Sequence, residues 1–248
     1  MSESSVTLWP PFRAQDHVND RKHHLLLACT GSVATIKLPL ILESLSACSD
    51  LSIRLVLTPS AAAFLANQSA EQPSLDSLAK LANVDAIYTD EDEWRQPWTR
   101  GASILHIELR RWADLLVIAP LSANSLAKVV AGMSDNLLLS VIRAWDTTGS
   151  IDPARPGINI KGKKMIVVAP AMNTAMWMHP VTTKQIAVLR DEWGVENSGW
   201  FEVLMPIEKE LACGDTGAGA MRDWKEVVRV VEERLCLQAS YANARAID

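Results

Sequence analysis

Four short apolar runs constrain most strongly how this chain can fold. They are HLLLAC (24–29), IRLVL (53–57), LLVIA (115–119) and MIVVA (165–169), and each leads into a turn rich in threonine, serine or proline. In most cases a helical pattern follows the turn. Strands that are apolar on both faces and alternate with helices predict a parallel sheet covered on both sides. We therefore expect an α/β fold: a doubly wound, flavodoxin-like or Rossmann-like sheet with helices on both faces, in a single domain.

The boundaries of this domain follow from the composition along the chain. Residues 1–22 carry adjacent prolines and scattered charges, which predicts a disordered lead-in. Residues 23–237 are expected to form the domain, and residues 238–248 a frayed tail. Inside the domain, the polar stretch 146–163 is rich in glycine and proline, and strand-like sequence resumes directly after it. It therefore predicts a surface loop insertion rather than a linker.

Charge and cysteine usage exclude several classes of protein. The net charge of −5 gives no basic surface for nucleic acid, and the apolar runs are far too short to span a membrane. The first twenty residues have no apolar core of a signal peptide. The four cysteines form no CxxC pair, which favours reduced thiols in the cytoplasm. His23, His24 and His179 have no partners at metal-ligand spacing, so we expect no metal site.

The turns after the four runs are the expected binding site. Right-handed crossovers bring the carboxyl ends of parallel strands to one edge of the sheet, and ligands of open α/β sheets bind there. Neither G-x-G-x-x-G nor G-x-x-x-x-G-K-[ST] occurs, which weighs against a dinucleotide site and a P-loop. Hydroxyls and free N–H groups at helix starts suit one phosphate, as in FMN. The alternative is that these hydroxyls only cap helices.

Three side chains stand out as candidates for chemistry. His106 lies near the start of a predicted helix, Asn173 follows the fourth run, and Cys213 lies in a glycine-rich loop. Each has a plain alternative: an exposed or structural histidine, an asparagine that caps a turn, and a packing cysteine. Cys29, Cys48 and Cys236 are expected to be inert packing residues.

Several blocks of sequence resemble a known family. They are TGSVA (30–34), LHIELRRWADLLVIAPLSANSLAKV (105–129), GMSDNLL (132–138), RAWD (143–146), PAMNTAMW (170–177) and ACGDTGAGAM (212–221). In this order and over residues 24–232 the chain resembles the flavin-dependent cysteine decarboxylases, which include phosphopantothenoylcysteine decarboxylases and halotolerance proteins. The resemblance implies a flavoprotein domain that binds FMN. It also implies a homotrimer with its active sites between subunits.

The resemblance assigns roles to individual residues. The FMN contacts it implies are Gly31, Ser32, Val33, Thr58, Ser60, Ser122, Ala123, Asn124, Ser125 and Ala171. The substrate contacts it implies are Asn173, Met176, Glu210, Ala212 and Met221. His106 and Cys213 match the catalytic positions, where His106 is expected to act as a base near the substrate thiol and Cys213 as a late proton donor. Relatives usually carry Lys or Arg where this chain has Glu210, so the substrate contact expected there is one made by the backbone.

The implied reaction converts 4′-phosphopantothenoylcysteine to 4′-phosphopantetheine in coenzyme A biosynthesis. The thiol is oxidised to a thioaldehyde, CO2 leaves, and the product is reduced again, with the flavin as electron carrier. The alternative is a non-catalytic regulatory subunit, as among halotolerance proteins that inhibit a protein phosphatase. Those proteins typically carry a long acidic tail, whereas this chain ends in QASYANARAID and has His106, Asn173 and Cys213 together. This combination favours the enzyme.

Overall fold

The central element of the fold is a six-stranded parallel sheet with the strand order β3-β2-β1-β4-β5-β6. The computed structural model describes residues 12–95, 97–152, 155–158, 162–210 and 216–237. The strands are β1 (His23–Cys29), β2 (Leu51–Leu57), β3 (Val84–Tyr88), β4 (Leu115–Leu121), β5 (Met165–Pro170) and β6 (Phe201–Val203). The doubly wound fold is confirmed. Its strand order is that of a Rossmann sheet, in which successive strands are added on one side up to β3 and on the other side from β4 onward.

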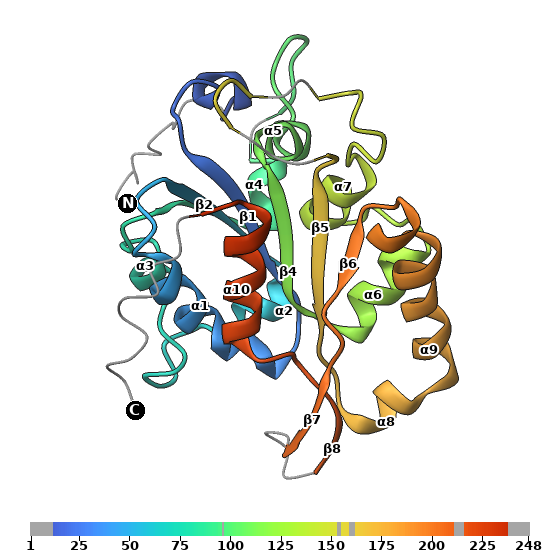
Figure 1. Ribbon diagram of the computed structural model, residues 1–248. Coiled ribbons are helices and arrows are strands. Elements are labelled where there is room, and N and C mark those ends of the chain that lie inside the picture. The colour runs from blue at the N-terminus through green and yellow to red at the C-terminus, as the bar shows by residue number, and fades with distance from the viewer. Residues whose placement is uncertain (1–11, 96, 153–154, 159–161, 211–215, 238–248) are drawn as a thin grey trace.

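Helices cover both faces of this sheet (Figure 1). One face packs against α1 (Leu38–Leu45), α2 (Pro59–Ala62), α3 (Leu75–Leu78) and α10 (Trp224–Arg234). The other packs against α5 (Leu105–Trp112), α6 (Ala123–Val130), α7 (Leu137–Arg143) and α9 (Pro180–Ala187). Shorter elements are α4 (Asp90–Glu93), α8 (Thr174–Met178), the 3-10 helices η1 (Ala14–His17), η2 (Val33–Lys37) and η4 (Val195–Asn197), and the π-helix η3 (Val188–Glu192).

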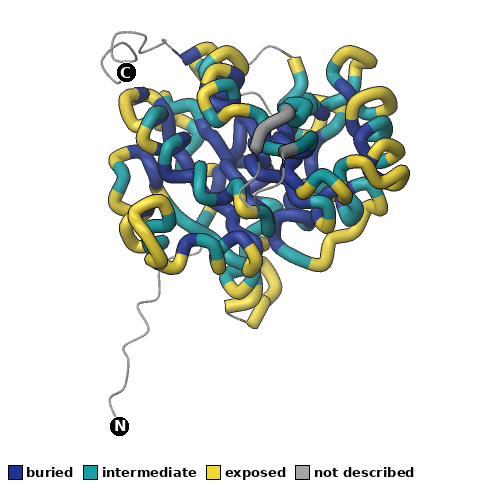
Figure 2. Tube along the Cα trace, turned by 90° about the horizontal axis from the view of Figure 1, so that it is seen from below, coloured by how far each residue is buried: buried dark blue, intermediate teal, exposed yellow. Residues whose placement is uncertain are grey.

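Alternation along β1 explains why its sequence has no polar face. Leu25 and Leu27 pack into the core beneath α1 and α10, whereas Leu26 and Ala28 pack into the core beneath α5 and α7. All four are fully buried. Burying a leucine side chain stabilises a fold by about 1.5–3 kcal/mol, so a central strand of this kind anchors both layers. Figure 2 shows the buried residues gathered inside the molecule under more exposed helices.

A small hairpin extends the fold beyond the sheet. β7 (Ile207–Glu210) pairs antiparallel with β8 (Thr216–Ala220), and the hairpin lies beside α8 at the carboxyl ends of the strands (Figure 1). The four apolar runs predicted β1, β2, β4 and β5 correctly. They missed β3, whose residues are mostly only half-buried at the sheet edge, the three-residue β6, and this hairpin.

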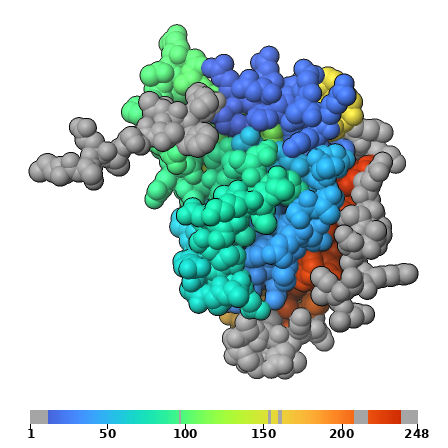
Figure 3. Space-filling view, turned by 90° about the vertical axis from the view of Figure 1, so that its left-hand side faces the viewer, coloured from blue at the N-terminus to red at the C-terminus, as the bar shows by residue number. Residues whose placement is uncertain are grey.

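Residues 12–22 depart from the predicted disordered lead-in. They form η1 and pack on the domain: the backbone N–H of Ala14 donates to Glu108 at 2.8 Å, and the Phe12 ring lies 4.0 Å from the Arg54 guanidinium carbon. Figure 3 shows this dark blue segment beside the green stretch that precedes α5, where the Ser103 hydroxyl donates to the Phe12 carbonyl. One aromatic anchor and a few hydrogen bonds order the segment despite its charges. Residues 1–11 and 238–248 lie outside the described residues.

The described part of the 146–163 insertion is fastened to the domain at its first residue. Asp146 is almost fully buried, and its carboxylate accepts hydrogen bonds from the backbone N–H groups of Thr148, Gly149, Ile151 and Asp152. Burial opposes ionisation, but these bonds and one from the Thr148 hydroxyl hold the pKa of Asp146 well below its usual value. The insertion therefore begins as an ordered turn built around one carboxylate.

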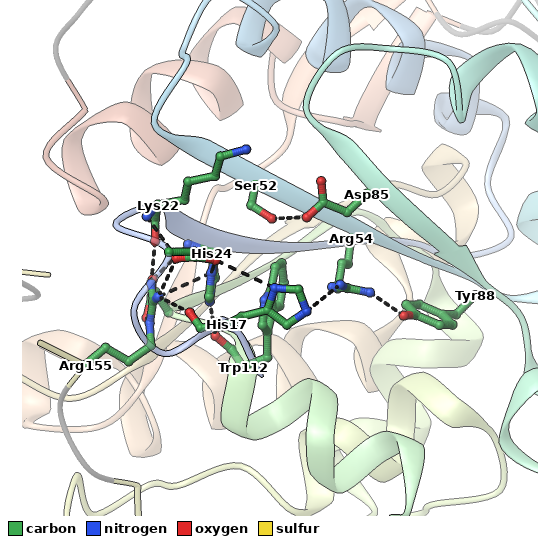
Figure 4. A network of polar contacts seen from close by, with 11 residues as sticks. His17, Lys22, His24, Ser52, Arg54, Asp85, Tyr88, Trp112 and Arg155 are labelled. Atoms are coloured by element: carbon green, nitrogen blue, oxygen red, sulfur yellow. Dashed lines mark hydrogen bonds and ion pairs between the residues drawn. The ribbon is translucent and has the colours of Figure 1, made fainter. Parts of the chain in front are cut away.

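Further along the same insertion, Arg155 completes a buried network at the amino ends of β1 and β4 (Figure 4). Its guanidinium pairs with Asp114 and also contacts Asp20 at 3.3 Å and the ring of His24 at 3.2 Å. His24 donates its backbone N–H to Asp114 and stacks on Trp112, with 4.3 Å between ring centroids. Segments more than 90 residues apart in the sequence thus share one polar cluster.

Candidate active site

A cavity of about 820 Å³ opens at the carboxyl ends of β1, β4 and β5, where the strand order reverses. Drug-sized ligand sites have volumes of about 300–1,000 Å³. Its wall includes ten of the predicted site residues: Gly31, Ser32, Val33, Ser122, Ala123, Asn124, Ala171, Asn173, Met176 and Met221. The sequence therefore brings together residues from both halves of the chain at the edge of the sheet where a ligand was expected.

Thr30 joins the turn after β1 to the turn after β4. Its backbone N–H and its hydroxyl both donate to the carbonyl of Pro120, at 3.1 and 2.9 Å. The same hydroxyl oxygen accepts a hydrogen bond from the backbone N–H of Ser122 at 2.7 Å. Thr30 is fully buried, so this contact fixes the separation of the two turns that face each other across the cavity.

Gly31 is required by the close approach of the turn after β2. A Cβ atom added at Gly31 would lie 2.5 Å from the Cβ of Ser60. The hydroxyl of Thr58 caps α2 by accepting the N–H of Ala61 at 3.3 Å. The second turn thus supports the first turn from behind, and neither Thr58 nor Ser60 is among the residues that line the cavity.

At the start of α6 the hydroxyls act as helix caps, as the alternative interpretation of this turn expected. Ser122 accepts the N–H of Ser125 at 3.3 Å and donates to the Ser125 hydroxyl. Ser125 is buried one turn into the helix and does not line the cavity. The N–H groups of Ala123 and Asn124 remain, because the first N–H groups of a helix have no acceptor within it. Backbone donors of this kind suit a phosphate or a ring carbonyl.

Asn173 is both a helix cap and a cavity residue. Its side-chain oxygen accepts the N–H of Met176 at 2.9 Å, which starts α8. The oxygen is thereby used, and within the described residues the side-chain NH2 group has no partner. An amide whose oxygen is fixed in this way presents two N–H donors, which suit a carboxylate. The predicted substrate contact and its structural alternative are therefore both present in one side chain.

Two cationic side chains on the cavity wall were missed by sequence reasoning. Lys37 follows the first turn at the end of η2, and Arg222 directly follows Met221. Neither has an ion-pair partner among the described residues. A lysine three residues after TGSVA and an arginine directly after GAGAM were the available signals. Together they give the cavity positive charge for anionic groups.

Apart from Asp223, which caps α10 by accepting the N–H of Lys225, the rest of the wall is apolar. It includes Ile36, Phe64, Met172, Ile207 and Trp224, together with small residues at the turns. Apolar side chains with a few placed donors are what a flat aromatic ring bearing one phosphate needs. The residues present thus fit FMN: donors at two helix starts and positive charge for the phosphate, and an apolar wall for the ring.

His106 lies apart from this cavity in its own chain. It is the second residue of α5, and its ring Nδ1 lies 2.8 Å from a carboxylate oxygen of Glu93 at the end of α4. The ring is 23% exposed, so it is accessible from outside the subunit. Ala212 and Cys213 lie outside the described residues. Glu210 ends β7, where its backbone pairs with Thr216.

The remaining thiols are poor nucleophiles or lie elsewhere. Burial raises the pKa of Cys29 far above its usual value, and its Sγ donates to the carbonyl of Ala119. Burial also raises the pKa of Cys48, helped by the charge of Glu232. These two packing cysteines were predicted, whereas Cys236 is exposed rather than packed.

The described residues contain neither a metal-binding cluster nor a membrane-spanning helix. Among them, no group of three or more histidine, cysteine, aspartate or glutamate side chains is arranged to hold a metal ion. No helix in the same part of the chain has the length and apolar character to cross a membrane.

The chain is similar to a known protein family and to several characterised proteins. Residues 13–236 match the flavoprotein family model. Mouse phosphopantothenoylcysteine decarboxylase is 38% identical over 221 residues, which cover 89% of this chain and 91% of the mouse protein. The chain spans only about a third of two longer yeast relatives: 31% of a probable thymidylate synthase of Schizosaccharomyces pombe and 34% of coenzyme A biosynthesis protein 3 of Saccharomyces cerevisiae.

Solved structures agree with this assignment. A cysteine-to-serine mutant of PPC decarboxylase complexed with pantothenoylaminoethenethiol is 40% identical, with a TM-score of 0.67 over 86% of this chain and 98% of that one. The FMN binding protein AtHal3 is also 40% identical, with a TM-score of 0.65 over 88% of this chain and all of that one. With its Rossmann-ordered sheet and a cavity suited to FMN, the chain belongs to the flavoprotein family.

Proposed function

We propose that this protein is an FMN-dependent decarboxylase that converts 4′-phosphopantothenoylcysteine to 4′-phosphopantetheine. The observation that carries the proposal is Asn173, which lines the cavity where the strand order reverses. Its oxygen caps a helix, and its NH2 group has no partner among the described residues. The similarity to the mouse decarboxylase and to the substrate-analogue complex supports the same substrate.

Bound FMN would supply reversible two-electron oxidation, which gives the substrate an electron sink for loss of CO2. The side chains of this protein would then bind and orient the substrate. The Asn173 amide would donate to the carboxylate that is lost, and Lys37 and Arg222 would place positive charge near the phosphate groups of the substrate and the cofactor. Met176 and Met221, on the same wall, would exclude water from the reacting carbon.

Two proton transfers are assigned to His106 and Cys213. His106 would take the proton of the substrate thiol before oxidation, because a neutral imidazole nitrogen can act as a general base. Cys213 would donate a proton when the product is reduced. Both roles come from the match with the family, and the position of His106 outside the cavity of its own chain bears on how the site is assembled.

A homotrimer with shared sites would bring His106 to the cavity of a neighbouring subunit. The exposed large apolar side chains include Trp94, Trp98 and Ile104 in the region of α4 and α5, and Val33 and Met176 at the cavity. Trp94 is 74% exposed, which is unusual for such a side chain. Two different patches that pair head to tail produce a closed ring if the rotation closes. The free thiols of Cys29 and Cys48 support the cytoplasm as its location.

The proposal is tested by spectroscopy and by CO2 release. The purified protein should carry a flavin spectrum, release FMN on denaturation, and liberate CO2 from phosphopantothenoylcysteine. Flavin-replete, folded protein that releases no CO2 from this substrate would contradict the assigned reaction.

Shared sites are tested by mixing two inactive variants. His106→Asn lacks the base and Asn173→Asp lacks the carboxylate donor, so each alone should be inactive. After dissociation and reassembly in equal amounts, about a quarter of the sites should combine an intact cavity with an intact His106 from a neighbour. If activity stays absent in mixed trimers, His106 does not act across the interface.

A further inference from the structure

One buried carboxylate holds His106 at two points. The Glu93 oxygen Oε1 lies 2.8 Å from the ring Nδ1, and Oε2 accepts the backbone N–H of the same histidine at 3.2 Å. The Glu93 side chain is only 5% exposed. Both carboxylate oxygens of Glu93 therefore contact His106. Together these two contacts fix the start of α5 and the plane of the imidazole ring.

Glu93 is the last residue of the short acidic helix α4, whose sequence is DEDE. Its acidic residues have different partners. Asp92 accepts the N–H of Thr89 and caps α4 itself, whereas Asp90 accepts the N–H of Leu137 at 3.1 Å and caps α7. Glu93 supplies a cap to α5, whose own N-cap residue Ile104 has no capping side chain. Only Glu93 also touches an imidazole, so a capping role does not account for its second contact.

The second contact determines which ring nitrogen carries the proton. An ionised carboxylate only accepts hydrogen bonds, so Nδ1 must be the protonated nitrogen in the neutral ring. The lone pair then lies on Nε2. A histidine without partners prefers the opposite tautomer, with the proton on Nε2. Glu93 therefore selects the tautomer in which the outer nitrogen can accept a proton.

We propose that Glu93 is a positioning residue that makes His106 a base at Nε2. This inference rests on the proposed function, in which His106 takes the proton of the substrate thiol. As Nε2 accepts that proton, the thiol becomes a thiolate and the ring becomes an imidazolium. Nδ1 keeps its proton, and its N–H group continues to donate a hydrogen bond to Glu93. The carboxylate gains no proton and faces the new positive charge at 2.8 Å.

The matched pair of variants is Glu93→Gln and Asp90→Asn. Both remove one negative charge from the same helix and both keep an oxygen that can cap the next helix. In Glu93→Gln the amide NH2 group can face Nδ1, which then becomes an acceptor, so the proton moves to Nε2. Asp90 touches no histidine, so Asp90→Asn should leave the ring unchanged.

The direct readout is the tautomer of His106 in the flavin-loaded protein. Long-range ¹H–¹⁵N correlation spectra of ¹⁵N-histidine-labelled protein distinguish the two neutral tautomers, and His106→Asn identifies the signal among the five histidines. We expect Nδ1–H in the wild type and in Asp90→Asn, and Nε2–H in Glu93→Gln. An Nε2–H wild type, or an Nδ1–H ring in Glu93→Gln, would overturn the inference whatever the activity is.

Turnover is the second readout. CO2 release should fall by about 10²- to 10⁴-fold in Glu93→Gln and stay within about twofold in Asp90→Asn. If the tautomer changes while Glu93→Gln still turns over normally and His106→Asn is inactive, the tautomer is not required and the inference fails. If His106→Asn is also fully active, the base assigned in the proposed function fails, which is a separate result.

Discussion

Both ends of β1 and β4 carry polar groups, but the groups at the two ends differ in their partners. At the amino ends, His24, Asp114 and Arg155 contact one another and are buried. At the carboxyl ends, Thr30 and Ser122 hold the turns together, while backbone N–H groups and the Asn173 amide have no partner among the described residues. At the amino ends the charged groups are paired within the chain, although Nδ1 of His23 and Nε1 of Trp112 beside them have no partner among the described residues. At the carboxyl ends the donors lie at a cavity that a ligand can enter.

This contrast separates structural from functional polarity. An unpaired buried polar group costs about 1–3 kcal/mol, whereas donors at an open cavity can be satisfied by water or by a ligand. The Arg155 network therefore belongs to the fold, even though it is rich in groups that could do chemistry. The cavity donors belong to the ligand. Variants at the two ends should accordingly separate stability from binding.

The largest effect is expected at the amino end. Asp114→Ala leaves the buried Arg155 without its main partner and should lower the free energy of unfolding by about 3–5 kcal/mol. Chemical denaturation measures this loss. Flavin affinity of the folded variant should stay unchanged. The control is Asp191→Ala, which breaks an exposed pair with Arg190 and should cost under about 0.5 kcal/mol. Equal losses in the two variants would show that the network is not structural.

At the carboxyl end, Asn173→Asp should have the opposite signature. An aspartate keeps the oxygen that caps α8, so stability should change by less than about 0.5 kcal/mol. The new carboxylate replaces two donors and repels the carboxylate of the substrate, so CO2 release should fall by at least about 10²-fold. Steady-state assays and denaturation curves on one preparation make the comparison. A variant that loses stability but keeps turnover would reverse our assignment of Asn173.

Gly31→Ala tests the close contact between the turn after β1 and the turn after β2. The added methyl meets the Cβ of Ser60 at 2.5 Å, so the first turn must shift, at a cost of about 1–3 kcal/mol. Flavin affinity should fall by roughly tenfold or more, as measured by fluorescence titration. The second substitution Ser60→Gly removes the colliding atom and should restore most of the affinity. If the double variant binds flavin as weakly as the single one, the collision is not the cause.

The smallest effect is the pH dependence of the network. Burial lowers the pKa of His24, and the charge of Arg155 lowers it further. The unfolded chain then binds a proton at higher pH than the folded one, so stability is lost as the pH falls from about 6.5 toward the lowered pKa. His17 contributes in the same direction, because burial and Arg54 lower its pKa. Denaturation at several pH values should show a shallower dependence in His24→Gln; a stability that rises from pH 7 to 5 would contradict this sign.

Sequence reasoning identified the parts of the molecule that local pattern determines. Continuous apolar runs predicted four central strands, and the turns after three of them supplied cavity residues from Gly31 to Asn173. It did not predict β3, where Asp85 and Tyr88 interrupt the apolar pattern of a sheet-edge strand. Such a strand is held by pairing with β2 rather than by burial of both faces.

Contacts between distant segments were also beyond local pattern. The sequence places Arg155 in a polar loop, and its pairing with Asp114, 41 residues away, depends on the folded structure. The two contacts of Glu93 with His106 depend on how α4 packs against α5. The acidic sequence DEDEW alone does not indicate them. Short-range spacing therefore predicted the turns of the site, while the partners of its charged groups came from tertiary packing.

The most direct test of the contrast between the two ends is early-time amide hydrogen exchange with and without FMN. Brief labelling reports local opening rather than global unfolding. We predict that FMN added to flavin-stripped protein slows exchange in residues 30–36, 121–126 and 170–176, and leaves residues 20–25 and 110–116 unchanged. Slower exchange at the amino ends of the strands without any change in the three turns would contradict the account.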